Sequence, residues 1–139
     1  MTEYGHLATI RKYFEGRNRA DVEMMMSTFD ADITHYFLND PPVRVAKEIA
    51  TKWAAFNQEG RTARWTVDHA IEEGDEAVIE WTLVYTRPDR SPPTTVFRGA
   101  EWYVFRRGRI FEIRAYELTG ERRNELNEYP YITRGYPTP

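Results

Sequence analysis

The hydrophobic positions of the chain change their period, from helical spacing near the N-terminus to alternation in the second half. Leu7, Ile10, Tyr13 and Phe14 recur at helical intervals and predict an amphipathic helix over residues 3–16. This helix would place one apolar face against the rest of the protein.

Two further helices are predicted before residue 60. Asp21 can cap a short second helix, and a strand is expected over residues 33–38, ended by a double proline. A third helix over residues 43–58 carries Trp53 in its buried stripe.

Apolar and polar residues then alternate, which is typical of strands with one buried face. Four strands are predicted, over residues 62–73, 77–86, 95–105 and 109–118. Short turns between consecutive strands favour antiparallel pairing. The sequence therefore predicts an α+β fold in which a curved, mostly antiparallel sheet wraps around three N-terminal helices.

The strand at 95–105 places a carboxylate in an apolar row. Glu101 shares a face with Phe97, Tyr103 and Phe105, because strand side chains alternate between faces. Either this face meets water or Glu101 lines a pocket. Burial would penalise the charged form, and no basic residue shares that face nearby, so we expect a protonated carboxyl that donates a hydrogen bond.

The register of the last hairpin decides which way Glu101 points. A three-residue loop over 106–108 would pair Glu101 with Ile113 and keep both on the inner face. Gly99 and Ala115 would then leave space beside Glu101. A two-residue loop would instead exchange the faces of the last strand.

Composition narrows the functional classes. The 139 residues predict one domain over 1–139, and the net charge of -3 argues against a nucleic-acid partner. The chain has no cysteine, no paired histidine spacing and no glycine-rich phosphate loop, so we expect neither metal nor cofactor. No apolar run approaches a membrane span, and a cytoplasmic protein without membrane contact is expected. The aromatic, proline-rich segment 119–139 is expected to pack on the domain or on a dimer partner.

Two passages carry a resemblance to a known family. RNRADVEMMMSTFDADI, residues 17–33, resembles the second helix and first strand of SnoaL-like and ketosteroid isomerase-like proteins, and GRIFEIRAY, residues 108–116, resembles their last hairpin. These proteins belong to the nuclear transport factor two-like superfamily. The resemblance covers about residues 5–118. It implies a cone-shaped, cystatin-like α+β barrel with a pocket between sheet and helices.

The resemblance also implies roles for single residues. Tyr13 lies eight residues before Asp21, as the isomerase tyrosine does, and Glu101 falls at the place of the isomerase acid. In that family the tyrosine and the acid stabilise a developing oxyanion. Phe37 occupies the place of the family's catalytic aspartate, so the usual base is replaced. The Asp–Arg–Asp set of limonene-epoxide hydrolases is absent.

The candidate catalytic residues are Glu101, Tyr13 and His35, with His35 as the base because its ordinary pKa is about 6.5. The remaining candidates share the inner strand faces or the buried helix stripe. The predicted substrate-binding residues are Phe37, Trp53, Trp65, His69, Trp81, Tyr85, Tyr103, Ile113 and Glu117.

Two functions follow from these candidates. The first is a cofactor-free acid/base enzyme, of isomerase, cyclase or dehydratase type, on a small apolar carbonyl-bearing substrate. The second is a non-catalytic protein of the same fold that binds a hydrophobic small molecule. In both cases we expect a homodimer formed through the outer sheet face, where Trp102 and Tyr116 lie among charged residues.

Overall fold

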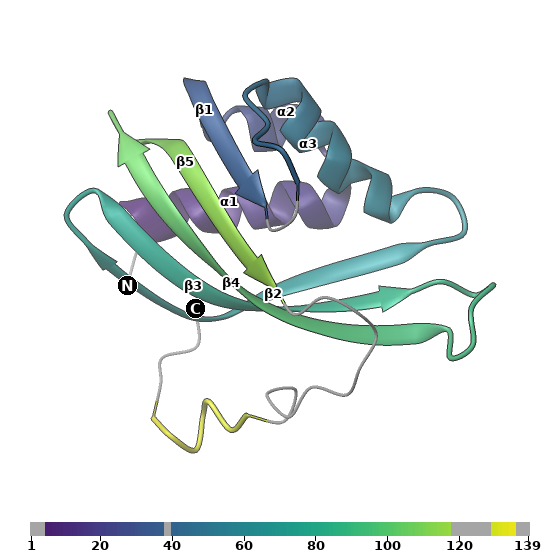
Figure 1. Cartoon of the computed structure of the whole chain (residues 1–139). Coiled ribbons are helices and arrows are strands. Elements are labelled where there is room, and N and C mark those ends of the chain that lie inside the picture. Colours follow the sequence, from purple (N-terminus) through teal and green to yellow (C-terminus); the bar gives the residue numbers. More distant parts are fainter. Residues whose placement is uncertain (1–4, 38–39, 118–128, 136–139) are drawn as a thin grey trace.

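The computed structural model describes residues 5–37, 40–117 and 129–135. The helices and the first strand occupy the N-terminal part of the chain, which then runs through four long strands (Figure 1). The elements are α1 (His6–Arg19), α2 (Val22–Met26), β1 (Phe29–Phe37), α3 (Ala46–Ala54), the 3₁₀ turn η1 (Ala55–Asn57), β2 (Thr62–Glu73), β3 (Glu76–Thr86), β4 (Thr94–Arg106) and β5 (Arg109–Glu117).

The strands form one five-stranded sheet in the order β1-β5-β4-β3-β2. β1 pairs with β5 in parallel, whereas the other three pairings are antiparallel. The sheet curves, and all three helices cover one of its faces (Figure 1). This arrangement confirms the predicted α+β class. Among the described residues, no helix has both the length and the apolar character that a membrane crossing requires.

The first helix extends past its predicted end at residue 16. Ala20 closes α1 in a left-handed conformation with φ 53°, and the Asp21 amide donates to the Gly16 carbonyl at 2.9 Å. The Asp21 side chain then caps α2 by accepting from Met24 N, as predicted. The extra turn carries Arg17 onto the apolar stripe of α1, seven residues after Ile10, and fully buries it.

The last hairpin has a two-residue turn, so the predicted three-residue loop is wrong. Arg107 and Gly108 both have positive φ, at 55° and 76°, which suits a tight turn between twisted strands. A β-bulge between the Val104 and Phe105 pairings then shifts the register of β5, and Glu101 pairs with Ala115. Because the bulge on β5 offsets the shorter turn, Ile113 and Ala115 remain on the same inner face as Glu101.

A second bulge changes the outcome for β2. The register shifts between Val67 and His69, so that His69 lies opposite Glu80 on the outer face. Ile71 is also turned outward and is 60% exposed. The prediction that His69 faces the pocket is therefore wrong, because alternation was assumed to continue without an inserted residue.

Residues 129–135 lie on the face of the sheet opposite the helices (Figure 1). The Tyr131 hydroxyl donates to Glu80 Oε2 at 3.0 Å and accepts from Arg98 Nη2. Arg98 also donates to Asp68 at 2.9 Å, which joins β2, β3 and β4 through one polar cluster. The rest of the predicted C-terminal segment, residues 119–128 and 136–139, lies outside the described residues.

Candidate functional site

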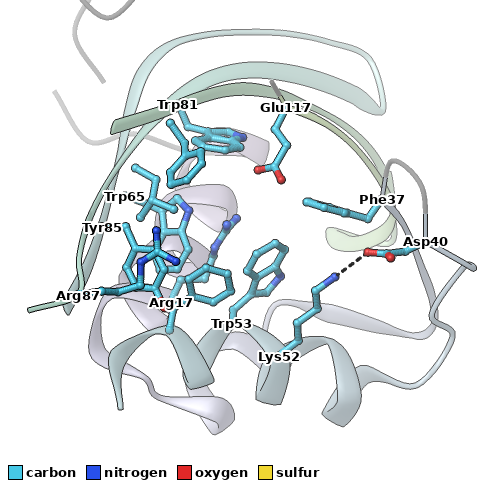
Figure 2. Close-up of a pocket in the computed structure, with 13 residues that line it drawn as sticks. Arg17, Phe37, Asp40, Lys52, Trp53, Trp65, Trp81, Tyr85, Arg87 and Glu117 are labelled. Atoms are coloured by element: carbon cyan, nitrogen blue, oxygen red, sulfur yellow. Dashed lines mark hydrogen bonds and ion pairs between the residues drawn. The ribbon is translucent and has the colours of Figure 1, made fainter. Parts of the chain in front are cut away.

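A cavity lies between the concave face of the sheet and helices α1 and α3. Its volume of about 490 Å³ falls within the range typical of small-molecule sites. Aromatic side chains form most of its wall, and charged groups lie at its floor and rim (Figure 2). The lining residues are Arg17, Phe37, Asp40, Lys52, Trp53, Phe56, Trp65, Trp81, Leu83, Tyr85, Arg87, Phe97 and Glu117.

Strand β3 supplies one wall of this cavity. Trp81, Leu83 and Tyr85 alternate along β3, so all three point toward the helices. Trp81 pairs with Gly99 on β4, and its ring lies directly over that glycine. A Cβ at position 99 would overlap the Trp81 ring and the Tyr116 carbonyl oxygen. Glycine is therefore required there for the observed position of the Trp81 ring.

Arg17 carries a fully buried positive charge beside this wall. Its guanidinium carbon lies 4.0 Å from the centre of the Trp53 ring, 4.4 Å from Trp65 and 4.5 Å from Phe14. Figure 2 shows Arg17 between Trp65 and Trp53. Cation–π attraction is strongest where water is excluded, so these rings both hold the guanidinium and compensate part of its lost hydration.

Glu101 is the partner of Arg17. Arg17 Nη1 donates to Glu101 Oε1 at 3.1 Å, and both side chains are 0% exposed. The Tyr103 hydroxyl donates to the other carboxylate oxygen, Oε2. No basic residue of its own strand face was expected near Glu101, and the cation beside it comes instead from α1. Glu101 thus accepts two hydrogen bonds within the protein, where a hydrogen-bond donor had been expected.

Tyr13 is close to this pair but lies below the cavity. It is fully buried, and its ring contacts Phe29 and Tyr103 edge-on at centroid distances of 5.2 and 6.5 Å. Burial raises the pKa of the Tyr13 hydroxyl well above its usual value, while the Arg17 charge opposes that rise. Tyr13 therefore remains a neutral phenol, and it is absent from the cavity lining.

Several hydrogen-bond donors around the cavity have no partner. Among the described residues, no acceptor is within hydrogen-bond distance of Arg17 Nε or Nη2 or of the indole nitrogens of Trp53, Trp65 and Trp81. The Tyr13 hydroxyl is the polar group near Arg17 and Trp53; burial raises its pKa, and both of these residues lower it against that effect. Buried donors are usually paired, so a group of them beside one cavity is able to donate to a bound molecule. The arrangement suits a ligand that presents oxygen atoms.

Glu117 is one of two carboxyl groups among the described residues that line the cavity, the other being Asp40. It lies at the end of β5 opposite Gly99, and Figure 2 shows its carboxylate directed into the space between Trp81 and Phe37. Burial, together with the negative charge of Glu101, raises the pKa of Glu117 above its usual value. A carboxyl with a raised pKa in a cleft is a candidate for proton transfer.

Lys52 and Asp40 stand at the rim. Lys52 Nζ lies 3.4 Å from Asp40 Oδ2, with the two side chains 37% and 50% exposed. Lys52 also lies over the Phe37 ring, 4.4 Å from its centre. An exposed pair of this kind contributes little to stability, so Lys52 is free to reorient toward a ligand.

His35 occupies the core behind the cavity wall. It is 2% exposed, and its ring lies 5.7 Å from Trp53 and 5.9 Å from Phe37. Burial lowers the pKa of His35 to about 3, helped by the Arg17 and Lys52 charges. A group of this pKa is a weak base, and His35 is not among the lining residues.

The structure thus brings together most of the predicted pocket. Phe37, Trp53, Trp65, Trp81, Tyr85 and Glu117 line the cavity as expected. Tyr103 and Ile113 are fully buried on the inner face but do not line it, and His69 lies on the outer face. Of the three residues proposed as catalytic, Glu101 and Tyr13 both contact Arg17. The third, His35, is buried and stacks on Phe37.

Arg17 was the residue that sequence reasoning missed. Its position follows Ile10, Tyr13 and Phe14 by seven, four and three residues, which is the continuation of the same helical stripe. A longer predicted helix would have placed it in the core.

Comparison with known proteins identifies relatives of this arrangement. A family model described as a SnoaL-like domain matches residues 10–113. A solved structure from Methylobium petroleophilum, a protein of unknown function with a cystatin-like fold, is 30% identical with a TM-score of 0.69, over 96% of this chain and 91% of that one. None of the curated proteins compared matches the chain.

Two more distant structures share the fold. A candidate polyketide cyclase from Xanthomonas campestris is 18% identical with a TM-score of 0.68, over 79% of this chain and 87% of the other. An epoxide hydrolase of M. tuberculosis resembling limonene-epoxide hydrolases is 14% identical with a TM-score of 0.67, over 80% of each chain. At these identities the likeness concerns the fold alone.

Proposed function

Because the chain belongs to the SnoaL-like domain family, we propose that it is an acid/base enzyme acting on a small, largely apolar substrate that bears a carbonyl group. One observation carries the proposal: the Glu117 carboxyl, with its raised pKa, faces an aromatic cavity beside the unpaired donors of Arg17. The candidate polyketide cyclase and the epoxide hydrolase that share this fold are compatible with such a site.

In the proposed reaction Glu117 is the base. A Glu117 carboxylate oxygen takes a proton from the carbon next to the carbonyl, and the C–H electron pair becomes the new C=C bond. The carbonyl oxygen becomes an enolate oxygen, which accepts hydrogen bonds from Arg17 and from the indole N–H groups. Return of the proton to another carbon gives an isomerase, and attack of the enolate carbon on a second carbonyl gives a cyclase.

The resemblance assigned the oxyanion hydrogen bonds to Tyr13 and Glu101. In this proposal Arg17 donates them instead, and Glu101 holds Arg17 in position. The oxyanion donor in this proposal is the Arg17 guanidinium, which Glu101 and the surrounding rings hold in place. Glu101 is a positioning residue here, because it touches Arg17 and Tyr103 rather than the cavity.

The test is hydrogen exchange in a simple ketone. 2-Tetralone is incubated in D₂O with the protein, and loss of its α-proton signal is followed by NMR. We expect exchange above buffer background for the wild type, and at least about a hundredfold less for Glu117→Gln, as for loss of a general base. Glu73→Gln, on an exposed residue at the end of β2, is the matched control. Equal exchange rates in wild type and Glu117→Gln would reject the proposal.

The second candidate is a binding protein without catalysis. It is favoured by Phe37 at the place of the family base and by the burial of His35. In that case ketones bind in the cavity but their α-protons exchange no faster than in buffer.

A further inference from the structure

One edge of the Arg17 guanidinium is unused. Nη1 donates to Glu101, whereas Nε and Nη2, which lie together on the other edge, have no acceptor within hydrogen-bond distance among the described residues, the Tyr13 hydroxyl being the polar group near Arg17. Two parallel N–H groups on one edge match the spacing of two oxygens in a carboxylate. The Arg17 side chain is fully buried and lines the cavity.

We propose that the cavity binds its ligand through a planar anion with two oxygens, received by the Nε and Nη2 edge of Arg17. This proposal narrows the substrate class of the proposed function. It rests on the proposed function, because it takes the same cavity as the substrate site. Two ligand types share this chemistry: an aromatic or alicyclic carboxylate, and the enolate of a 1,3-dicarbonyl compound.

The aromatic rings around Arg17 leave the Nε and Nη2 edge of its guanidinium as the side on which a ligand can approach. Trp53, Trp65 and Phe14 lie within 4.5 Å of the guanidinium carbon and cover the faces of the group. The Glu101 pair fixes its rotation in the plane. A group held in this way is preorganised, which reduces the entropy lost when a ligand binds.

The apolar wall fits the rest of such a ligand. The aromatic and aliphatic wall of the cavity is formed by Trp65, Trp81, Leu83, Tyr85 and Phe97. The unpaired indole nitrogens of Trp53 and Trp65 add donors near the guanidinium. The cavity therefore offers a charged anchor and an apolar body site within about 490 Å³.

Charge balance gives the site a pH dependence. Arg17 is already paired with Glu101, so a bound anion adds negative charge near Glu117. Besides the effect of burial, the Lys52 charge lowers the pKa of Glu117, and the Asp40 charge raises it. The raised pKa of Glu117 allows it to be protonated beside that anion. Carboxylate binding should thus take up a proton and weaken as the pH rises, and Glu117→Gln should remove that dependence.

The first experiment compares a carboxylate with its neutral counterpart by isothermal titration calorimetry. 2-Naphthoate and 2-naphthamide have the same aromatic body. We expect the wild type to bind naphthoate at least about tenfold more tightly, as for a charge-assisted bidentate pair. Arg17→Lys keeps the positive charge but lacks the two parallel N–H groups of the guanidinium. It should reduce the preference for naphthoate over naphthamide to about threefold or less.

A second measurement needs no variant, in case Arg17→Lys does not fold. Addition of 2-naphthoate to the wild type should shift the ¹H–¹⁵N signal of the Arg17 Nε–H group, whereas 2-naphthamide should leave it in place. An unshifted Arg17 signal, or equal affinity for the two naphthalenes, argues against carboxylate capture.

A 1,3-dicarbonyl probe separates the two ligand types. Benzoylacetone should show the ultraviolet absorption of its enolate when bound. Naphthoate preference alone identifies a carboxylate ligand, and enolate absorption alone identifies a dicarbonyl. Absence of both overturns the proposal. Naphthoate preference without tetralone exchange would reject the acid/base function while keeping the Arg17 anchor.

Discussion

Arg17 and Glu101 lie 84 residues apart in the chain, and their side chains meet at 3.1 Å with neither exposed to solvent. The pair joins α1 to β4 beneath the cavity. Removing two charges from water is costly, and their attraction offsets that cost only when both partners are present. The pair therefore holds the guanidinium in position more than it stabilises the fold.

Breaking this pair should be much more costly than breaking an exposed one. We expect Glu101→Leu to lower the free energy of unfolding by about 3–5 kcal/mol, because Arg17 is left as an uncompensated buried charge. The double variant Arg17→Met/Glu101→Leu should recover most of that loss. Urea unfolding followed by circular dichroism measures all three proteins.

The matched control is the exposed pair of Glu15 and Arg19, whose side chains are 49% and 63% exposed. Glu15→Gln should change the unfolding free energy by about 0.5 kcal/mol or less. A double variant that is no more stable than Glu101→Leu would show that the pair contributes more than mutual neutralisation.

The pH dependence of Glu117 follows from its raised pKa. The folded protein binds the Glu117 proton more tightly than the unfolded chain does. Glu117 therefore costs no folding free energy below pH 4.5, the ordinary pKa of a glutamate, and it destabilises the fold as the pH rises through the folded pKa. Glu117→Gln should therefore become more stable relative to the wild type above pH 4.5. Urea midpoints of both proteins across the pH range measure this.

The same group sets the expected rate profile. Proton abstraction needs the carboxylate, so tetralone exchange should increase with pH and level off above the folded pKa of Glu117. Carbon-13 NMR of the glutamate carboxyls gives that pKa independently. A rate profile that follows a different titration would assign the base to another group.

The pattern of the strands made the fold predictable, but not the details of the site. Alternation placed Trp81 and Tyr85 on the inner face, because burial on one side imposes a period of two on the sequence. The inward position of Glu101 was predicted with the wrong turn, and the bulge after Val104 restored the face. A bulge inserts one residue without a distinctive composition, which is why His69 was misplaced.

Arg17 shows the other limit of the pattern. Hydrophobic periodicity treats arginine as polar, so it cannot predict a guanidinium that aromatic rings and a carboxylate hold inside the core. The partners come from α1, α3, β2 and β4, which only the folded chain brings together. The chemistry of Glu101 therefore depended on a contact that spacing along β4 does not contain.

His35 should destabilise the fold in acid. Its folded pKa of about 3 lies below the ordinary pKa of 6.5. Between these two pH values the unfolded chain binds a proton on His35, whereas the buried imidazole of the folded protein stays neutral. Stability is fully present above pH 6.5 and falls toward pH 3, by about 1.4 kcal/mol per pH unit for one proton. His35→Leu should lack this component when urea unfolding is compared at pH 7 and pH 5.

Imidazole NMR gives a direct check on the same residue. The His35 ring signals should not titrate between pH 5 and pH 8, in contrast to those of an exposed histidine. A midpoint near the ordinary 6.5 would restore His35 as a candidate base and contradict its placement in a dry core.

We expect the protein to form a homodimer through the outer face of the sheet. Trp102, Tyr116 and Val84 are 39%, 49% and 41% exposed on the face opposite the helices, and exposed apolar groups of this kind often mark interfaces. Arg98 lies on the same face but is 6% exposed and donates a hydrogen bond to the Tyr131 hydroxyl. The interface should therefore lie over β4 and β5, away from residues 129–135.

Trp102→Glu tests this dimer. A carboxylate there would be buried without a partner in the interface, so we expect light scattering at micromolar concentration to give a dimer for the wild type and a monomer for the variant. Val45→Glu places the same charge on a 50% exposed residue at the start of α3, outside the sheet face, and should remain dimeric. Unchanged circular dichroism would show that both variants fold. A monomeric wild type would contradict the expectation outright, and a dimeric Trp102→Glu would move the interface to another surface.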